Sequence, residues 1–121
     1  MKDNRVEEND FVLFYLSPRK KWLIQVTNEK QIHTHAGFIE GKDVIGKEYG
    51  QCVITNTNNE IYLLYPKLND YIFKSKRATQ ILYPKDMAII ASWTDLSNGM
   101  NVIEAGTGSG SLSCVIANLI R

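Results

Sequence analysis

The sequence predicts an α+β chain: a small, barrel-like antiparallel β domain is followed by the opening strand, loop and helix of a second, incomplete α/β domain. Three observations support this. The first sixty-odd residues contain short β-type runs separated by turn residues, residues 67–96 change to helical spacing, and glycines at 106–110 separate an apolar run from an apolar helix. We therefore expect a β domain over 1–66, a linker helix and cofactor-flanking segment over 67–86, and the start of the α/β domain over 87–121.

The composition is that of an ordinary globular domain. The 121 residues are 44% hydrophobic and 22% charged, with 3 prolines and a net charge of +1, which excludes wholesale disorder. The first ten residues are polar, and no apolar run reaches the roughly 18 residues of a membrane span. Cys52 and Cys114 lie 62 positions apart without metal-ligand spacing. We expect two reduced thiols in a cytoplasmic protein, or a nuclear one in a eukaryote, with no membrane partner.

The β domain is predicted from five short strands. Each is rich in β-branched and aromatic residues and ends at a turn signal. The expected strands are residues 11–16, 22–26, 31–35, 51–55 and 60–65. Residues 19–21 form the expected polar turn after the first strand, and Asn-Thr-Asn-Asn at 56–59 forms a hairpin turn.

Two helices are predicted after Pro66. Leu68, Tyr71 and Ile72 have helical spacing, and this short helix carries a local basic stretch. Residues 80–83 are extended because a proline follows, and Pro84 suits the first turn of a helix that ends near Leu96. The basic stretch contains five cations: Lys67, Lys74, Lys76, Arg77 and Lys85. It is either a solvated face or a phosphate contact. The candidates for phosphate contact are Lys74, Lys76 and Arg77. For Lys85, a surface or helix-capping role is the alternative to a role in the site.

The glycine-rich loop is the strongest functional signal. Residues 100–105 read as a buried strand, and Gly106, Gly108 and Gly110 then occupy relative positions one, three and five before a helix over 112–120. A dinucleotide fingerprint needs its third glycine at position six, where Ser111 stands, and a phosphate-binding loop needs a lysine that is absent here. The remaining interpretation is an S-adenosylmethionine site, in which the Glu104 carboxylate would lie beside the cationic end of the cofactor. The alternative is a tight turn that binds nothing.

Four further segments, together with this loop, resemble the tRNA (adenine-N1)-methyltransferases of the T-loop adenosine type. They are residues 32–39 (IHTHAGFI), 43–47 (DVIGK), 65–71 (YPKLNDY) and 76–86 (KRATQILYPKD). The match runs in order from about residue 10 to 115. The resemblance implies the N-terminal portion of a longer enzyme, with a Rossmann-like methyltransferase domain that begins near residue 87.

The resemblance also implies the site residues. S-adenosyl-L-methionine would be bound by Gln80, Leu82, Tyr83, Glu104, Gly106, Gly108, Ser109, Gly110, Ser111 and Leu112. The family's ribose-binding carboxylate and the aspartate near the target adenine correspond to positions beyond Arg121. No catalytic residue is therefore expected within the chain, and these 121 residues alone should be inactive.

The full-length protein is expected to form 1-methyladenosine in the T-loop of tRNA. Its partners would be tRNA and either three further copies or a non-catalytic paralogue in a hetero-tetramer; the intact Glu104 and glycines favour the catalytic type of subunit. The alternative is a non-enzymatic RNA-binding or subunit-interaction module built from the β domain.

The remaining candidates have structural interpretations. His33 and His35 share one face of a strand, but no third or fourth ligand is spaced for zinc, so we expect no metal. Trp22 and Trp93 are expected in the core, with base stacking as the minority interpretation.

Overall fold

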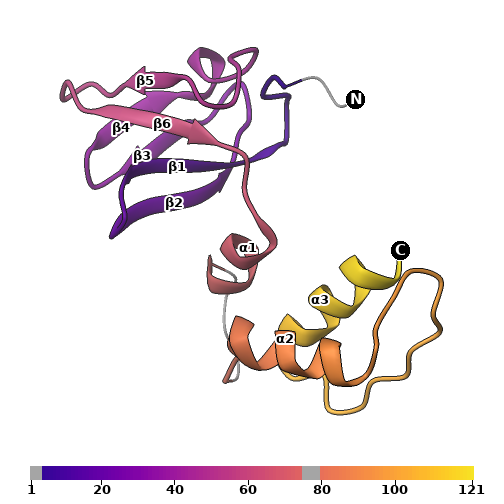
Figure 1. Ribbon diagram of the computed structural model, residues 1–121. Helices are drawn as coiled ribbons and strands as arrows, with labels where there is room; N and C mark the ends of the chain where they lie inside the picture. The colour runs from indigo at the N-terminus through magenta and orange to yellow at the C-terminus, as the bar shows by residue number, and fades with distance from the viewer. Residues whose placement is uncertain (1–3, 75–79) are drawn as a thin grey trace. The chain divides into compact units, whose positions relative to one another are not determined.

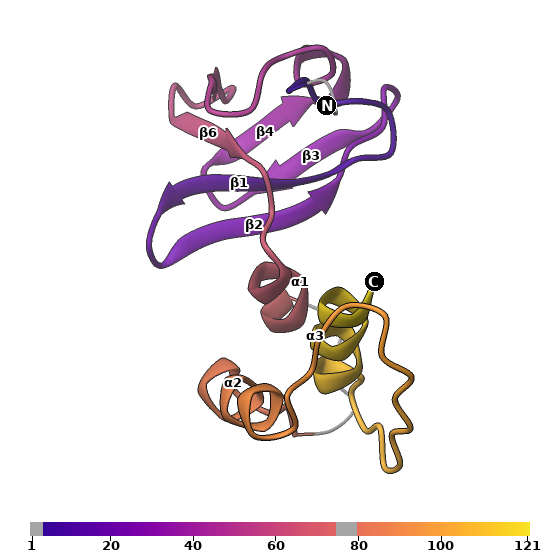
Figure 2. The same ribbon diagram turned by 45° about the vertical axis from the view of Figure 1, so that its right-hand side comes forward.

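The computed structural model describes residues 4–74 and 80–121, and the chain divides into two compact units, residues 1–74 and 75–121. The first unit contains six strands, a 3-10 turn and the helix α1, and the second contains α2 and α3 (Figures 1 and 2). The fold is therefore mixed α/β with antiparallel sheets.

Four strands of the first unit form an antiparallel sheet in the order β2-β1-β6-β5. Their bounds are Phe11–Ser17 for β1, Lys20–Gln25 for β2, Cys52–Ile54 for β5 and Glu60–Leu64 for β6. The predicted hairpin turn between β5 and β6 is confirmed, since the Thr55 amide donates to the Asn59 carbonyl at 2.9 Å. The first turn is shorter than expected: Lys20 already belongs to β2, so the turn consists of Pro18 and Arg19.

A separate two-stranded hairpin pairs β3 (Gln31–Thr34) with β4 (Gly37–Glu40), and the 3-10 turn Gly41–Asp43 follows. The sequence did not indicate β4, because a strand of four residues that begins with a glycine and is followed by another shows too little alternation. The backbone geometry explains why glycine stands at the start of β4 and directly after it. Gly37 has a φ of +103°, and a Cβ on Gly41 would lie 2.0 Å from the Thr27 carbonyl oxygen.

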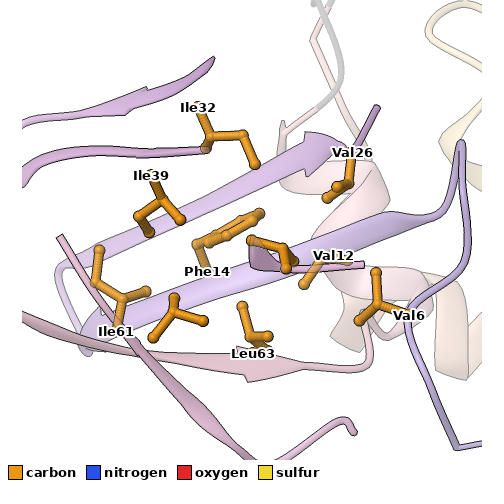
Figure 3. Packing of buried hydrophobic residues seen from close by; sticks show 10 residues of the cluster. Val6, Val12, Phe14, Val26, Ile32, Ile39, Ile61 and Leu63 are labelled. Atoms are coloured by element: carbon orange, nitrogen blue, oxygen red, sulfur yellow. The ribbon is translucent and has the colours of Figure 1, made fainter. Parts of the chain in front are cut away.

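Both sheets enclose one hydrophobic core. Ile32 and Ile39 from the hairpin lie in the same cluster as Phe14, Ile61 and Leu63 from the four-stranded sheet (Figure 3). The other members are Val6, Val12, Val26, Val44 and Val53. Through Val6, the polar start of the chain is tied to the rest of the β unit. The Val6 amide donates to the Lys47 carbonyl at 2.9 Å, and the Val6 carbonyl accepts from the Gly46 amide at 2.8 Å.

The helix α1 (Leu68–Lys74) forms where it was predicted and is part of the first unit. Ile72 is its buried residue. The Tyr71 ring meets Phe11 edge-on with centroids 5.8 Å apart, and Lys21 Nζ lies 3.3 Å from Asp70 Oδ1. This helix therefore packs beside β1 and β2 of the β unit.

In the second unit, α2 (Pro84–Trp93) begins at the predicted proline and buries Met87. It ends at Trp93, three residues before the predicted end. The expectation that Trp93 is a core residue is wrong, because this side chain is 88% exposed. Trp93 lies on a different side of the helix from Met87, and no other described part of this unit covers that side.

The strand expected at residues 100–105 is also not observed. These residues have no regular secondary structure, and Ile103 is 99% exposed. A strand is stabilised by ladder hydrogen bonds to a neighbour, and no described segment pairs with this one. The helix α3 (Ser111–Ile120) follows the glycine loop as predicted. Within residues 4–74 and 80–121, no helix is long and apolar enough to cross a membrane.

Candidate functional site

The glycine loop adopts a backbone that only glycine accepts readily. Gly106, Gly108 and Gly110 have φ values of +76°, +57° and +76°. A Cβ added to Gly106 or Gly110 would meet nothing within 4 Å, so conformation, not crowding, requires glycine at these two positions. The Gly110 amide donates to the Thr107 carbonyl at 2.9 Å and closes the turn.

The loop ends at the N-terminus of α3. Gly110 is the N-cap residue and supplies no side-chain hydrogen bond to the helix. The first turn begins with the Cys114 amide donating to the Gly110 carbonyl at 2.9 Å. The amide groups of an uncapped first turn form a natural site for an anionic group.

Glu104 precedes the loop and is oriented by the helix that follows it. The Ser113 hydroxyl, in the first turn of α3, donates a hydrogen bond to the Glu104 carboxylate. Glu104 is half-buried, and Ser113 contacts one of its two carboxylate oxygens, Oε2. The loop therefore places one oriented negative charge close to a helix N-terminus.

A cavity of about 300 Å³ lies against this loop. Its wall combines the extended segment before α2 with the loop itself: Gln80, Leu82, Glu104, Ala105, Gly106, Thr107, Gly108, Ser109, Ser111 and Leu112. Ile81 is buried while Gln80 and Leu82 line the cavity, which is the alternation expected of an extended chain.

Eight of the ten residues predicted to bind a cofactor line this cavity, and Tyr83 and Gly110 do not. Tyr83 is the extended N-cap residue of α2 and is 52% exposed. Ala105 and Thr107 line the cavity although the sequence did not single them out. The signal for them was their place between the predicted residues, since a loop wall built from backbone includes every residue along it.

The predicted phosphate contacts are only partly described. Lys74 is exposed at the C-terminal end of α1, whereas Lys76 and Arg77 lie outside the described residues. Lys85 is exposed in the first turn of α2 and does not line the cavity.

The histidines and cysteines show no metal-site geometry. Across the described residues, no three His, Cys, Asp or Glu side chains are grouped to hold a metal ion. Cys52 and Cys114 are exposed free thiols. His35 instead stacks on Trp22, which packs against the core cluster but is half-buried, so the expected core position of this tryptophan is met only in part.

Another depression lies on the β unit and has a different character. It encloses about 700 Å³ between the 3-10 turn and β5, and it is shallow and open. Lys42, Asp43 and Lys47 border it beside Ile45 and Ile54, and its helical element is the three-residue 3-10 turn, which is too short to form an anion site like the N-terminus of α3. The smaller cavity at the glycine loop is therefore the better candidate site.

Comparison with known proteins agrees with the loop geometry. A family model described as "tRNA methyltransferase complex GCD14 subunit" matches residues 59–121. The chain is 34% identical over 117 residues to the catalytic subunit of the Schizosaccharomyces pombe tRNA (adenine(58)-N(1))-methyltransferase. This alignment covers 96% of this chain and 32% of that protein. It is also 34% identical over 88 residues to a Thermus thermophilus tRNA (adenine(58)-N(1))-methyltransferase, covering 73% of this chain and 34% of that protein.

Solved structures resemble the chain over nearly its whole length. A SAM-dependent O-methyltransferase from Thermotoga maritima superposes with a TM-score of 0.89 at 34% identity, covering 97% of this chain and 44% of that one. The tRNA (m1A58) methyltransferase of Aquifex aeolicus gives a TM-score of 0.79 at 30% identity, covering 97% and 45%. The chain thus spans about a third of the length of the curated relatives it matches.

Proposed function

The chain belongs to the tRNA methyltransferase complex GCD14 subunit family, and we propose that it supplies the S-adenosylmethionine-binding loop of an enzyme that methylates N1 of an adenine in the T-loop of tRNA. One observation carries this proposal. The glycine loop, Glu104 and the segment around Leu82 enclose a single cavity that ends at an uncapped helix N-terminus.

The residues present fit this cofactor. Its methionine part carries an ammonium and a carboxylate, and it contains no phosphate. The Glu104 carboxylate suits the ammonium, while the first-turn amides of α3 suit the carboxylate. The cavity volume of about 300 Å³ is at the lower end of the range for small-molecule clefts, roughly 300–1,000 Å³. When bound, S-adenosylmethionine supplies a methyl group already activated on a sulfonium.

The contribution of this chain to the reaction would be binding and orientation. The positive-φ glycines let the loop backbone approach the cofactor closely, and Gln80 and Leu82 would lie along its adenosine part. Because the methyl group needs no further activation, in-line positioning toward N1 of a splayed adenine provides most of the catalysis.

The finer fold prediction supports the same function. We propose that the β unit closes into a barrel-like domain over residues 1–66, and that residues 87–121 open a Rossmann-like sheet with 100–105 as its first strand. In such a sheet, ligands bind at the carboxyl ends of the strands, where the glycine loop would lie. The exposed apolar residues around Ile103 would then be covered by neighbouring strands.

Substrate and assembly follow from the same premise. We propose that Lys74, Lys76 and Arg77 contact tRNA phosphates, and that the whole enzyme is a tetramer of one subunit type or of a catalytic and a non-catalytic type. By itself, the 121-residue chain should transfer no methyl group. Alanine at all three basic positions should weaken tRNA binding and reduce its salt dependence.

The test of the cofactor site is Gly108→Val in the enzyme that contains this chain. A β-branched side chain at a φ of +57° both strains the loop and enters the cavity, so methylation and cofactor binding should be lost while tRNA affinity is retained. Gly99→Val is the matched control, because Gly99 has a φ of +82° but does not line the cavity. Normal methylation by Gly108→Val, or equal loss in both variants, would contradict the proposal.

A further inference from the structure

The β unit carries an aromatic surface that the proposed cofactor site does not use. Trp22 lies on β2, the edge strand of the four-stranded sheet, and pairs across the sheet with the buried Phe14. The His35 ring stacks on Trp22, with centroids 6.2 Å apart and planes inclined by 25°. Trp22 is half-buried and His35 is exposed, so the stacked pair is fixed on one side and open to solvent on the other.

Beside the stacked pair lies a depression of about 290 Å³ lined by Trp22, His33, Thr34 and His35. His33 is exposed as well and contacts Phe38, its partner in the hairpin, at a centroid distance of 5.9 Å. The two histidines of the IHTHAGFI segment therefore face one hollow together with a tryptophan. We call Trp22, His33 and His35 the aromatic platform.

The hairpin tip that carries His35 is held rigidly by the turn between β5 and β6. The Thr57 hydroxyl and the Asn59 side-chain amide both donate to the Ala36 carbonyl, at 2.6 and 3.2 Å. The Phe38 amide donates to the Asn56 side-chain oxygen at 2.8 Å. A surface fixed in this way loses little conformational entropy when a ligand binds.

Positive charge lies next to the platform. Arg19 is exposed in the β1–β2 turn, and Lys20 is exposed at the start of β2, two residues before Trp22 and on the same side of the strand. Lys21, on the other side, forms an ion pair with Asp70, whereas neither Arg19 nor Lys20 has a carboxylate partner among the described residues. Aromatic faces beside unpaired cations match a chemistry that combines flat rings with phosphates.

We propose that the aromatic platform stacks an unpaired base of the RNA substrate, with Arg19 and Lys20 contacting the adjoining phosphates. The inference rests on the proposed function, because it assumes that RNA is the substrate. The platform adds an RNA contact on the β unit. This contact positions the RNA, while the glycine loop of the other unit holds the cofactor. An unpaired base is the expected ligand because a base within a duplex does not offer its face.

The test measures binding of the full chain to a 12-nucleotide single-stranded oligoadenylate without cofactor. His35→Ala should weaken binding about fivefold or more, as loss of one base-stacking contact does, with the salt dependence unchanged. His35→Phe keeps a ring at this position and should restore the affinity. Lys20→Ala should weaken binding and reduce the slope of log affinity against log salt by about 0.7, the value for one phosphate on a single strand.

Three further measurements make the result specific. The chain has 2 tryptophans, so Trp93→Phe leaves Trp22 as the only one, and its fluorescence should be quenched by the oligonucleotide. Tyr62→Ala is the matched control: Tyr62 is 46% exposed on the outer face of the same sheet, between the buried Ile61 and Leu63, and its loss should not change the affinity. A 12-base-pair RNA duplex should bind more weakly than the single strand.

The proposal is overturned if His35→Ala binds like the parent chain, if His35→Phe is as weak as His35→Ala, or if the chain binds no RNA. A chain that binds oligoadenylate through the platform but no S-adenosylmethionine would contradict the proposed function and leave the platform standing. Cofactor binding without any RNA binding would do the reverse.

Discussion

The two units differ sharply in how much apolar surface they bury. Among residues 4–74 and 80–121, fourteen hydrophobic residues are buried: twelve lie in the first unit, and Ile81 and Met87 lie in the second. The second unit leaves Trp93 and Ile103 at 88% and 99% exposure. Nevertheless, the cavity that we assign to the cofactor belongs to the second unit.

This contrast shows that the two units obtain their shape from different causes. The β unit is held by long-range packing, in which residues as distant as Val6 and Leu63 share one cluster. The glycine loop is shaped by local rules: left-handed glycines, one turn hydrogen bond and the start of a helix. A binding loop can therefore form on a unit that has little core, while the stability of the chain resides elsewhere.

The largest expected effect follows from removing a core residue of the β unit. Phe14 is fully buried, so Phe14→Ala should lower the free energy of unfolding by about 3–5 kcal/mol. Trp93→Ala removes a larger side chain that is mostly exposed and should change it by less than about 0.5 kcal/mol. Urea unfolding followed by far-UV circular dichroism measures both. Equal losses would mean that Trp93 is buried in solution, most simply against another copy of the chain.

Hydrogen exchange should separate the units without any mutation. Amides of β1 and β6 form ladder hydrogen bonds over a packed core and should exchange only on global unfolding. Amides of α3 should exchange through local opening and therefore much faster, because Ser111 is the only buried residue of this helix. Mass spectrometry of peptides from the two regions provides the comparison. Protection of α3 equal to that of β1 would contradict the contrast between the units.

The smallest expected effect is a loss of stability of the β unit at alkaline pH. The Tyr49 hydroxyl donates to Asp10 Oδ2 at 3.3 Å, and burial, followed by the Asp10 charge, raises the pKa of Tyr49 above its ordinary value of 10.0. Above about pH 10 the unfolded chain ionises this phenol while the folded chain does not, so the free energy of unfolding should fall as the pH rises.

Tyr49→Phe should make this fall shallower without abolishing it, because burial also raises the pKa of Tyr71. Urea unfolding at roughly pH 9 and pH 11 measures the difference between the two proteins. An unchanged slope in Tyr49→Phe would show that the phenol ionises equally easily in both states.

The sequence predicted those parts of the fold that depend on local pattern. Alternation and turn residues indicated five of the six strands, and Pro84 marked the start of α2. The pattern missed β4, which is defined by its pairing with β3, and it expected a strand at 100–105 where no described partner exists. It also placed Trp93 in a core, because an amphipathic spacing does not reveal whether anything covers the helix.

The candidate site was predicted on similar terms. Glycine spacing and the preceding glutamate located the cavity, since loop geometry is a local property. The Ser113 hydrogen bond to Glu104 was not predicted, because it depends on the direction in which the helix leaves the loop. The hollow between Trp22 and His35 likewise required the fold, since their two hairpins are separate in the sequence.

Gly41 carries a consequence for inheritance. Its backbone lies directly against the 27–30 turn, with its amide donating to the Lys30 carbonyl at 3.0 Å and with no room for a Cβ beside Thr27. Every missense change in this codon adds at least one carbon atom at that point. Even alanine would have to part the turn from the hairpin that carries His35, so an allele altered here should be defective although Gly41 lines neither the proposed cofactor cavity nor the hollow at the aromatic platform.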